Sequence, residues 1–208
     1  MLLSTAYFPP VSWLALAAQE PVQLEACENY QKQSYRNRCY ILSGDGPQML
    51  QVPVMHGREK ESFSLPITSV KVDYSTPWIL RTERALATAY ESSAYFEYYK
   101  DSLFETMEAR PDTLWELNLS LIRWCLNRCH IDCRIEPTPA FTAPGERADD
   151  FRYRIHPKHP DTVLADLGLN RPYYQVFRDR LGGFTPKMSC LDLLFNEGPD
   201  SIFWLKQL

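Results

Sequence analysis

The sequence lacks several features that would each define a class of protein. It has no apolar run of about 18 residues, so we predict no membrane-spanning helix. Basic residues are not in excess: 22 Lys and Arg stand against 26 Asp and Glu, which disfavours a nucleic-acid-binding protein. No lysine or arginine precedes Lys32, so the basic start of a secretory signal peptide is missing. We therefore expect a cytoplasmic protein.

Familiar catalytic and metal-binding motifs are missing as well. The chain carries no Walker-type phosphate loop, no G-x-S-x-G nucleophile motif and no H-E-x-x-H zinc motif. Four potential metal ligands lie close together in the sequence: Cys125, Cys129, His130 and Cys133. Structural zinc sites usually show a second cysteine pair, which is absent here. We expect these residues to have packing roles, and we predict neither a metal nor a cofactor.

What the sequence does contain is enough apolar material for one folded domain. Hydrophobic residues make up 45% and charged residues 23% of 208 residues, a length that can bury a core without disulfides. We predict a single domain over 1–208. Apolar segments at 2–8 and 22–26 predict two strands, and helical spacing over 11–19 predicts a helix between them. Strand, helix and strand in this order open an α/β unit, because parallel pairing requires such a crossover.

Further patterns extend this α/β prediction. Strands are predicted over 38–42, 48–54 and 67–74, with a hairpin turn at 43–46 and a polar loop over 56–65. A helical segment follows over 75–127, and its third helix begins with a capping box of Thr113 and Glu116. One more strand is predicted over 131–135, and a flexible loop over 137–150. The predicted fold is α/β: a mixed, largely parallel sheet with helices on both faces and a helical segment after the fifth strand.

The polar stretch 25–38 is the first candidate site. It places Lys32, Arg36 and Arg38 among the amides Asn29, Gln33 and Asn37, between two predicted strands. Tyr7 and Glu25 are expected at or near the carboxyl ends of strands, where open α/β sheets bind ligands. Guanidinium and amide groups together suit a phosphate, a carboxylate or a sugar. A hydrated loop with internal salt links explains the same composition equally well.

The segment 189–199 is the second candidate. Ser189 can cap a short helix that ends at Gly198-Pro199, with Asp192, Asn196 and Glu197 among apolar residues. A buried carboxylate must be paired or have a raised pKa, and either case suits a site. A structural role, in which Asp192 or Glu197 holds Arg36 or Arg38, is equally physical. Two other stretches favour structural interpretations: the aromatic run 95–99 as core, and the basic run 151–159 as a solvated face.

Four motifs together resemble the WbqC-like protein family of bacteria. They are Thr5-Ala-Tyr-Phe-Pro-Pro10, Glu28-Asn-Tyr-Gln-Lys-Gln-Ser-Tyr-Arg-Asn-Arg38, Leu50-Gln-Val-Pro-Val54 and Leu191-Asp-Leu-Leu-Phe-Asn-Glu-Gly-Pro199, the last with the Asn-Glu-Gly signature of that family. This chain departs from its relatives at Ser4-Thr5, where they often have Gln-Pro. It also has Thr82 where many relatives carry a histidine, which would matter if that histidine transferred a proton.

The resemblance implies a function in bacterial polysaccharide (O-antigen) biosynthesis, with which the named member of the family is associated. We then expect a group-transferase-like enzyme that acts on an activated sugar, with Lys32, Arg36 and Arg38 holding a phosphate or carboxylate. Asp192 or Glu197 would act as general base, while Tyr7 and Asn29 orient the substrate. The expected partner is a small anionic or sugar-containing molecule. The alternative is a non-catalytic scaffold for biosynthetic enzymes, and self-association is compatible with either.

Overall fold

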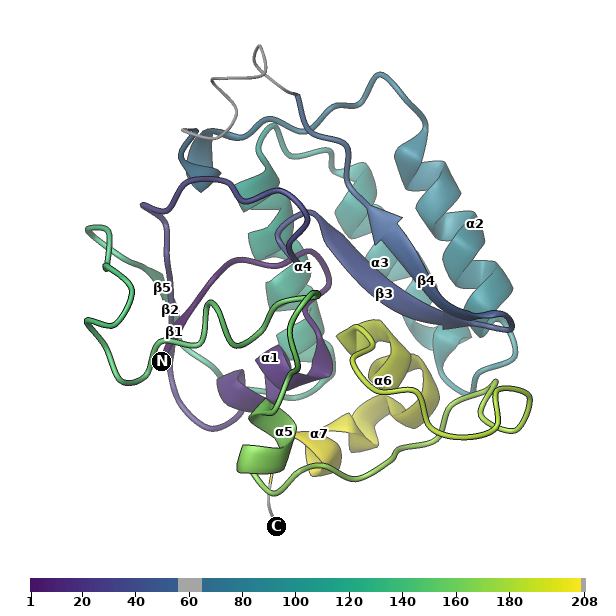
Figure 1. Ribbon diagram of the computed structural model, residues 1–208. Helices are drawn as coiled ribbons and strands as arrows, with labels where there is room; N and C mark the ends of the chain where they lie inside the picture. Colours follow the sequence, from purple (N-terminus) through teal and green to yellow (C-terminus); the bar gives the residue numbers. More distant parts are fainter. Residues whose placement is uncertain (56–64, 207–208) are drawn as a thin grey trace.

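The computed structural model describes residues 1–55 and 65–206, and its first sheet is small and parallel (Figure 1). Strands β1 (Leu2–Leu3), β2 (Val22–Leu24) and β5 (Ile135–Pro137) pair in the order β1-β2-β5. Leu2 is opposite Gln23 and Val22 is opposite Ile135. Helix α1 (Val11–Ala17), which is buried along its whole length, makes the crossover between the first two strands. A parallel sheet with a helical crossover confirms the α/β class.

The remaining strands form a separate antiparallel hairpin. Strand β3 (Arg38–Ser43) pairs with β4 (Gly46–Gln51), with Arg38 opposite Gln51 and Ser43 opposite Gly46. Gly46 has a φ of 108° in this turn, a conformation that L residues with side chains rarely adopt. The predicted hairpin is therefore confirmed, but the strands are divided between two sheets.

A strand over 67–74 is not formed, so that prediction is wrong. Residues Ile67–Ser69 form the 3-10 helix η1, and only isolated bridges follow, Lys71 with Thr113 and Val72 with Val54. The backbone of this segment hydrogen-bonds to two places: the Val72 N–H donates to the Asp112 carbonyl, before the helix that begins at Leu114, and the Asp73 N–H donates to the Pro53 carbonyl. The alternating valines do mark a buried face, but no neighbouring strand pairs along it. Most of the loop predicted over 56–65 lies outside the described residues.

Two other predicted strands exist, but one is shorter than predicted and the other lies further along the chain. The strand predicted over 2–8 ends at Leu3, after which the Tyr7 N–H donates to the Tyr35 carbonyl and Phe8 adopts a φ of 42°. The strand predicted over 131–135 lies at Ile135–Pro137 instead. The chain beyond it is anchored, because Thr138 and Thr142 both donate hydrogen bonds to the Glu25 carboxylate.

Three long helices pack beside the hairpin: α2 (Trp78–Tyr90), α3 (Phe96–Glu108) and α4 (Leu114–Arg128). The capping box is confirmed, since the Glu116 N–H donates to Thr113 Oγ1 and the Thr113 N–H donates to Glu116 Oε2. Leu114, Leu117 and Leu121 of α4 are fully buried. Among the described residues, no helix is both long and apolar enough to cross a membrane.

The C-terminal helices close the core from below in Figure 1. They are α5 (Val163–Asp166), α6 (Cys190–Glu197) and α7 (Ser201–Leu205), with the 3-10 helix η2 (Gly198–Asp200) between the last two. Cys190 on α6 packs against Cys125 on α4, with 3.2 Å between their sulfur atoms. Cys125 and Cys129 are core residues and Cys133 packs against the core, as expected, whereas His130 is exposed. Over residues 1–55 and 65–206, no three His, Cys, Asp or Glu side chains are placed to hold a metal ion.

Gly198 explains part of the Asn-Glu-Gly signature sterically. Its φ is 58°, and a Cβ atom at this position would lie 2.5 Å from the Tyr95 ring. The helix α6 ends here, and the Tyr95 N–H donates to the Phe195 carbonyl, so ring and backbone approach closely. Only glycine fits without moving one of them.

We predict that Gly198→Ala lowers the free energy of unfolding by about 2–4 kcal/mol, because the backbone strain and the overlap with Tyr95 add. Urea denaturation measures the loss. The double variant Gly198→Ala/Tyr95→Ala, which removes the ring, should recover part of it. Equal stabilities of Gly198→Ala and the native protein would contradict the steric explanation.

Candidate functional site

Arg36, an expected substrate ligand, is bound internally. Its Nε donates to Glu28 Oε1 at 2.7 Å and its Nη2 to Glu28 Oε2 at 2.5 Å, the bidentate geometry of a strong pair. Nη2 also donates to Ser4 Oγ, and Asn118 donates to the Arg36 carbonyl. The Arg36 side chain is only 3% exposed. The partner of Arg36 is thus Glu28, and the expected pairing with Asp192 or Glu197 is not formed.

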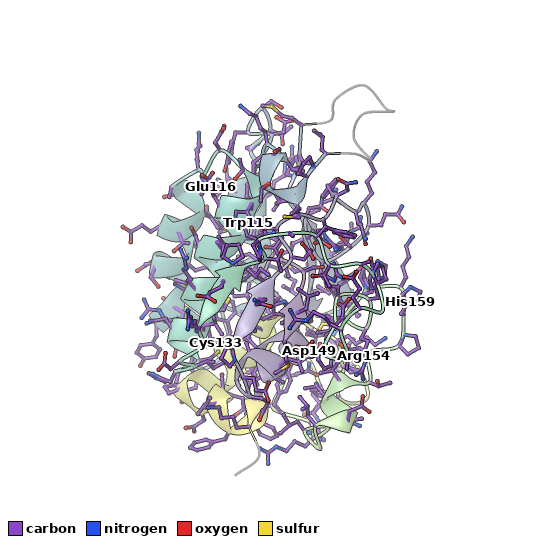
Figure 2. All side chains as sticks on the ribbon, turned by 90° about the vertical axis from the view of Figure 1, so that its left-hand side faces the viewer. Trp115, Glu116, Cys133, Asp149, Arg154 and His159 are labelled. Carbon is purple, nitrogen blue, oxygen red and sulfur yellow. The ribbon has the colours of Figure 1, made fainter. Side chains whose placement is uncertain are left out.

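Glu25 belongs to a second buried ion pair. Its Oε2 lies 3.0 Å from Nη1 of Arg152, and both side chains are fully buried. Arg152 also makes a bidentate pair with Asp150. The basic stretch 151–159 is therefore divided: Arg152 is inside, whereas Arg154 and His159 lie at the edge of the molecule in Figure 2. The solvated face predicted for 151–159 therefore holds for Arg154 and His159 and is wrong for Arg152.

Arg38 differs from both of these arginines. It lines a pocket of about 400 Å³, and no carboxylate of the described residues lies within salt-bridge distance of its guanidinium. Its Nε is buried, and within the described chain it has no hydrogen-bond acceptor. We call this cavity the Arg38 pocket; its lining residues are Tyr30, Lys32, Gln33, Asn37, Arg38, Gln51, Pro53, Val54 and Asp73.

Asn37 adds a second unsatisfied group to the Arg38 pocket. The side chain is 2% exposed, and its Nδ2 donates to the Val52 carbonyl at 3.0 Å. Its Oδ1 is buried and receives no hydrogen bond from any residue that the structure describes. Buried polar atoms without a partner are rare and costly in native proteins. Of the eleven such atoms in the described residues, Asn37 Oδ1 and Arg38 Nε are the two that belong to residues lining this pocket.

Charges around this pocket are mixed but mainly positive. Lys32 and Arg38 face Asp73, whose pKa is held below its ordinary value by hydrogen bonds from Ser75. Outside the pocket lining, burial and then the neighbouring His159 lower the pKa of His156, with smaller effects from Arg36, Lys158 and Arg38. The pocket can therefore bind a single anionic group next to uncharged hydrogen-bonding partners.

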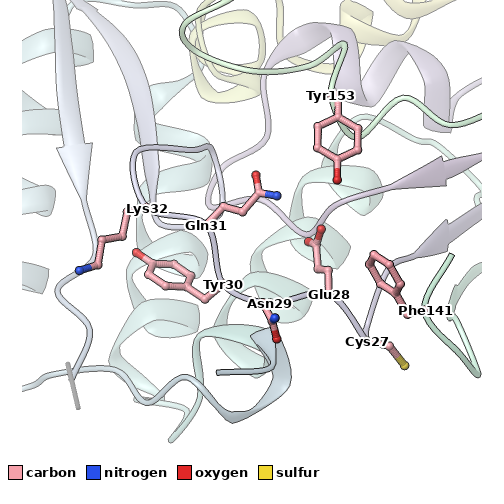
Figure 3. A pocket seen from close by; sticks show the side chains of 8 residues that line it. All are labelled: Cys27, Glu28, Asn29, Tyr30, Gln31, Lys32, Phe141 and Tyr153. Carbon is pink, nitrogen blue, oxygen red and sulfur yellow. The ribbon is translucent and has the colours of Figure 1, made fainter. Parts of the chain in front are cut away.

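A second pocket, of about 520 Å³, adjoins the first and shares Tyr30 and Lys32 with it (Figure 3). We call it the aromatic pocket; it is lined by Cys27, Glu28, Asn29, Tyr30, Gln31, Lys32, Phe141 and Tyr153. Figure 3 shows the Lys32 side chain extending past Tyr30, away from Phe141 and Tyr153. Tyr30 and Lys32 thus form the boundary between the two pockets.

Asp192, the expected general base, has three internal hydrogen-bond donors. It accepts hydrogen bonds from Tyr90 at 2.8 Å and from Tyr173 and Gln175 at 2.7 Å each. Burial raises the pKa of Asp192, and these hydrogen bonds act against that rise. The Tyr90 hydroxyl also accepts the Leu42 N–H, four residues along β3 from Arg38. At about 3.3 Å per residue, this places Asp192 on the order of 13 Å along the strand from the Arg38 pocket.

The other expected site residues are Glu197 and Asn196 on α6 and Tyr7, which follows β1, and all three contact other parts of the chain. Glu197 accepts a hydrogen bond from the Tyr174 N–H, and Asn196 donates to the Asp192 carbonyl. Tyr7 is fully buried against Trp78, and burial raises the pKa of its hydroxyl, which faces Thr82. The structure therefore gathers Asn29, Lys32, Gln33, Asn37 and Arg38 at the two pockets. The other predicted residues are buried elsewhere, except Glu197, which is half-buried at the end of α6. Phe141 and Tyr153 were missed because they belong to distant loops.

The comparisons with known proteins establish the family. The model of the WbqC-like protein family matches residues 5–159, three quarters of the chain, so this chain belongs to that family. Both pockets lie inside the matched range. The Asn-Glu-Gly signature at 196–198 lies outside it, and its glycine has the steric role described above.

One relative is similar over more of the chain than the family model matches. The sequence is 27% identical over 201 residues to the uncharacterized protein Rv1507c of Mycobacterium tuberculosis, covering 86% of this chain and 85% of the relative. No solved structure matches.

The contrast between the arginines gives a stability prediction. Glu28→Gln leaves the buried Arg36 charge without a carboxylate, so we expect a loss of about 3–5 kcal/mol in the free energy of unfolding. Arg38→Gln removes no ion pair within the described chain, so we expect a change of less than about 1 kcal/mol. Urea denaturation of both variants checks this. Similar losses would contradict the division of roles.

Asp192 gives a pH prediction. Because its native pKa is raised, the free energy of unfolding falls as the pH rises from the ordinary value of an aspartate through the native value. Tyr173→Phe removes a donor to the ionised carboxylate and raises the native pKa further. We expect it to cost about 1.5–3 kcal/mol near pH 8 and less near pH 4.

Denaturation at the two pH values tests this, with Tyr174→Phe, at the exposed neighbouring tyrosine, as the control. A loss in Tyr173→Phe that does not change with pH would show that the hydroxyl stabilises the fold without acting on the Asp192 carboxylate.

Proposed function

We propose that this protein binds the phosphate or carboxylate group of a small molecule in the Arg38 pocket, as part of group transfer in bacterial cell-surface glycan assembly. The observation that carries the proposal is Arg38 itself, a pocket-lining guanidinium without a carboxylate partner among the described residues. Its sequence neighbour Arg36 is fully paired. Guanidinium groups bind phosphates and carboxylates through two parallel hydrogen bonds, which suits an anionic substrate.

Membership of the WbqC-like family supports the glycan part of the proposal, through the association of its named member with polysaccharide biosynthesis. A general-base role for Asp192 or Glu197 stays a prediction. The binding proposal depends on neither residue, because both accept hydrogen bonds from other parts of the chain.

A scaffold function is the second candidate, and one observation favours it. Tyr98 is 79% exposed, and its ring lies 6.2 Å from that of Tyr95, so an aromatic surface is available to a protein partner. A scaffold needs no small-molecule ligand. The two candidates are therefore separated by whether an anion binds at Arg38.

We expect anionic compounds such as glucose 1-phosphate, glucuronate or inorganic pyrophosphate to raise the melting temperature, whereas neutral glucose does not. A ligand at 100 times its Kd stabilises the fold by about 2.7 kcal/mol, on the order of 5–10 °C for a chain of this size. A thermal-shift screen measures this.

Arg38→Gln should abolish the shift, and Arg123→Gln, at an exposed arginine of α4, should retain it. A shift that survives in Arg38→Gln places the anion elsewhere. If no compound raises the melting temperature of the folded protein, the scaffold function is favoured.

A further inference from the structure

The two pockets have different chemistry, and together they fit a ligand with two unlike parts. Both volumes, about 520 and 400 Å³, are in the range of small-molecule sites. We propose that the ligand is a nucleotide, with its base in the aromatic pocket and its phosphates in the Arg38 pocket. This inference rests on the proposed function, since the phosphate end occupies the anion site argued above.

The walls of the aromatic pocket are suited to a planar ring. Phe141 and Tyr153 are 52% and 46% exposed, although large aromatic side chains are usually buried. Both are held from behind by one cation: the Arg152 guanidinium lies 5.7 Å from the Phe141 ring centroid and 5.6 Å from that of Tyr153. The buried pairs with Glu25 and Asp150 fix Arg152 in turn. The two rings are therefore positioned in advance, with surface left for stacking.

Charge indicates which end of the ligand enters which pocket. Glu28 lines the aromatic pocket, but its carboxylate is held in the bidentate pair with Arg36, and no arginine lines this pocket. Asn29 and Gln31 offer amide donors and acceptors beside it, the groups that read the edges of a base. Lys32 extends past Tyr30, away from Phe141 and Tyr153 (Figure 3), and Arg38 lines only the Arg38 pocket. The phosphates therefore belong next to Arg38, and the uncharged ring belongs next to Phe141.

Isothermal titration calorimetry with the four common ribonucleoside diphosphates (ADP, GDP, CDP and UDP), their nucleosides and inorganic pyrophosphate tests this. At least one diphosphate should bind more tightly than pyrophosphate and than its own nucleoside. Phe141→Ala and Tyr153→Ala should each weaken that diphosphate by about 10-fold, the effect of losing one base–aromatic stack, and leave pyrophosphate binding unchanged. Arg38→Gln should weaken both ligands.

Matched controls are Phe203→Ala and Tyr98→Ala, at exposed aromatic residues outside both pockets, which should change neither affinity. If no diphosphate binds more tightly than pyrophosphate, or if Phe141→Ala and Tyr153→Ala bind like the native protein, the nucleotide inference is wrong and the anion site stands. If pyrophosphate and the diphosphates fail to bind, or bind equally well to Arg38→Gln, the anion site is wrong as well.

Discussion

The buried pair of Arg36 and Glu28 is the interaction on which the candidate site depends. Two side chains about 3% exposed would each be costly to bury alone, and their bidentate geometry offsets that cost. The pair joins two points of the 25–38 loop and ties them to Ser4 beside β1 and, through Asn118, to α4. A polar segment is thereby held against the core. The next two residues, Asn37 and Arg38, are fixed at a pocket, and Asn37 Oδ1 and Arg38 Nε keep no hydrogen-bond partner among the described residues.

The second buried pair acts in the same way on the other side of the loop. Arg152 joins Glu25 to Asp150 and supports the rings of Phe141 and Tyr153. These two pairs are thus buried where they organise the loops around the two pockets. Breaking either pair would leave a buried charge unpaired, so both the stability and the shape of the site depend on them.

Local sequence signals predicted the parts of the fold that local interactions determine. The Thr113–Glu116 capping box, the hairpin turn at Gly46 and the crossover helix α1 each depend on residues close together in the chain. The strand over 67–74 failed because alternation reports a buried face and says nothing of the hydrogen-bonding partner. The hydrogen bonds of this segment are divided between residues 53–55 and the turn before α4, more than 35 residues away, so no continuous strand forms.

In the candidate site too, local sequence predicted some residues, and contacts between distant residues decided the others. Composition identified the 25–38 loop, and the structure places Asn29, Lys32, Gln33, Asn37 and Arg38 at the pockets. Sequence could not tell Arg36 from Arg38, because the choice depends on which carboxylate meets which guanidinium in three dimensions. Nor could it find Phe141 and Tyr153, whose importance comes from one arginine packed behind both rings.

Arg36 stabilises the fold through Glu28, and Arg38 is the residue proposed to bind a ligand. Nuclear magnetic resonance of the arginine Nε–H groups, assigned with Arg36→Lys and Arg38→Lys, tests both roles within one sample. The Arg36 signal should exchange slowly with water and stay in place when pyrophosphate is added, while the Arg38 signal moves. If the Arg36 signal exchanges as fast as that of exposed Arg123, the structural role of Arg36 is wrong. If the Arg38 signal does not shift when pyrophosphate is added, the ligand-binding role of Arg38 is wrong.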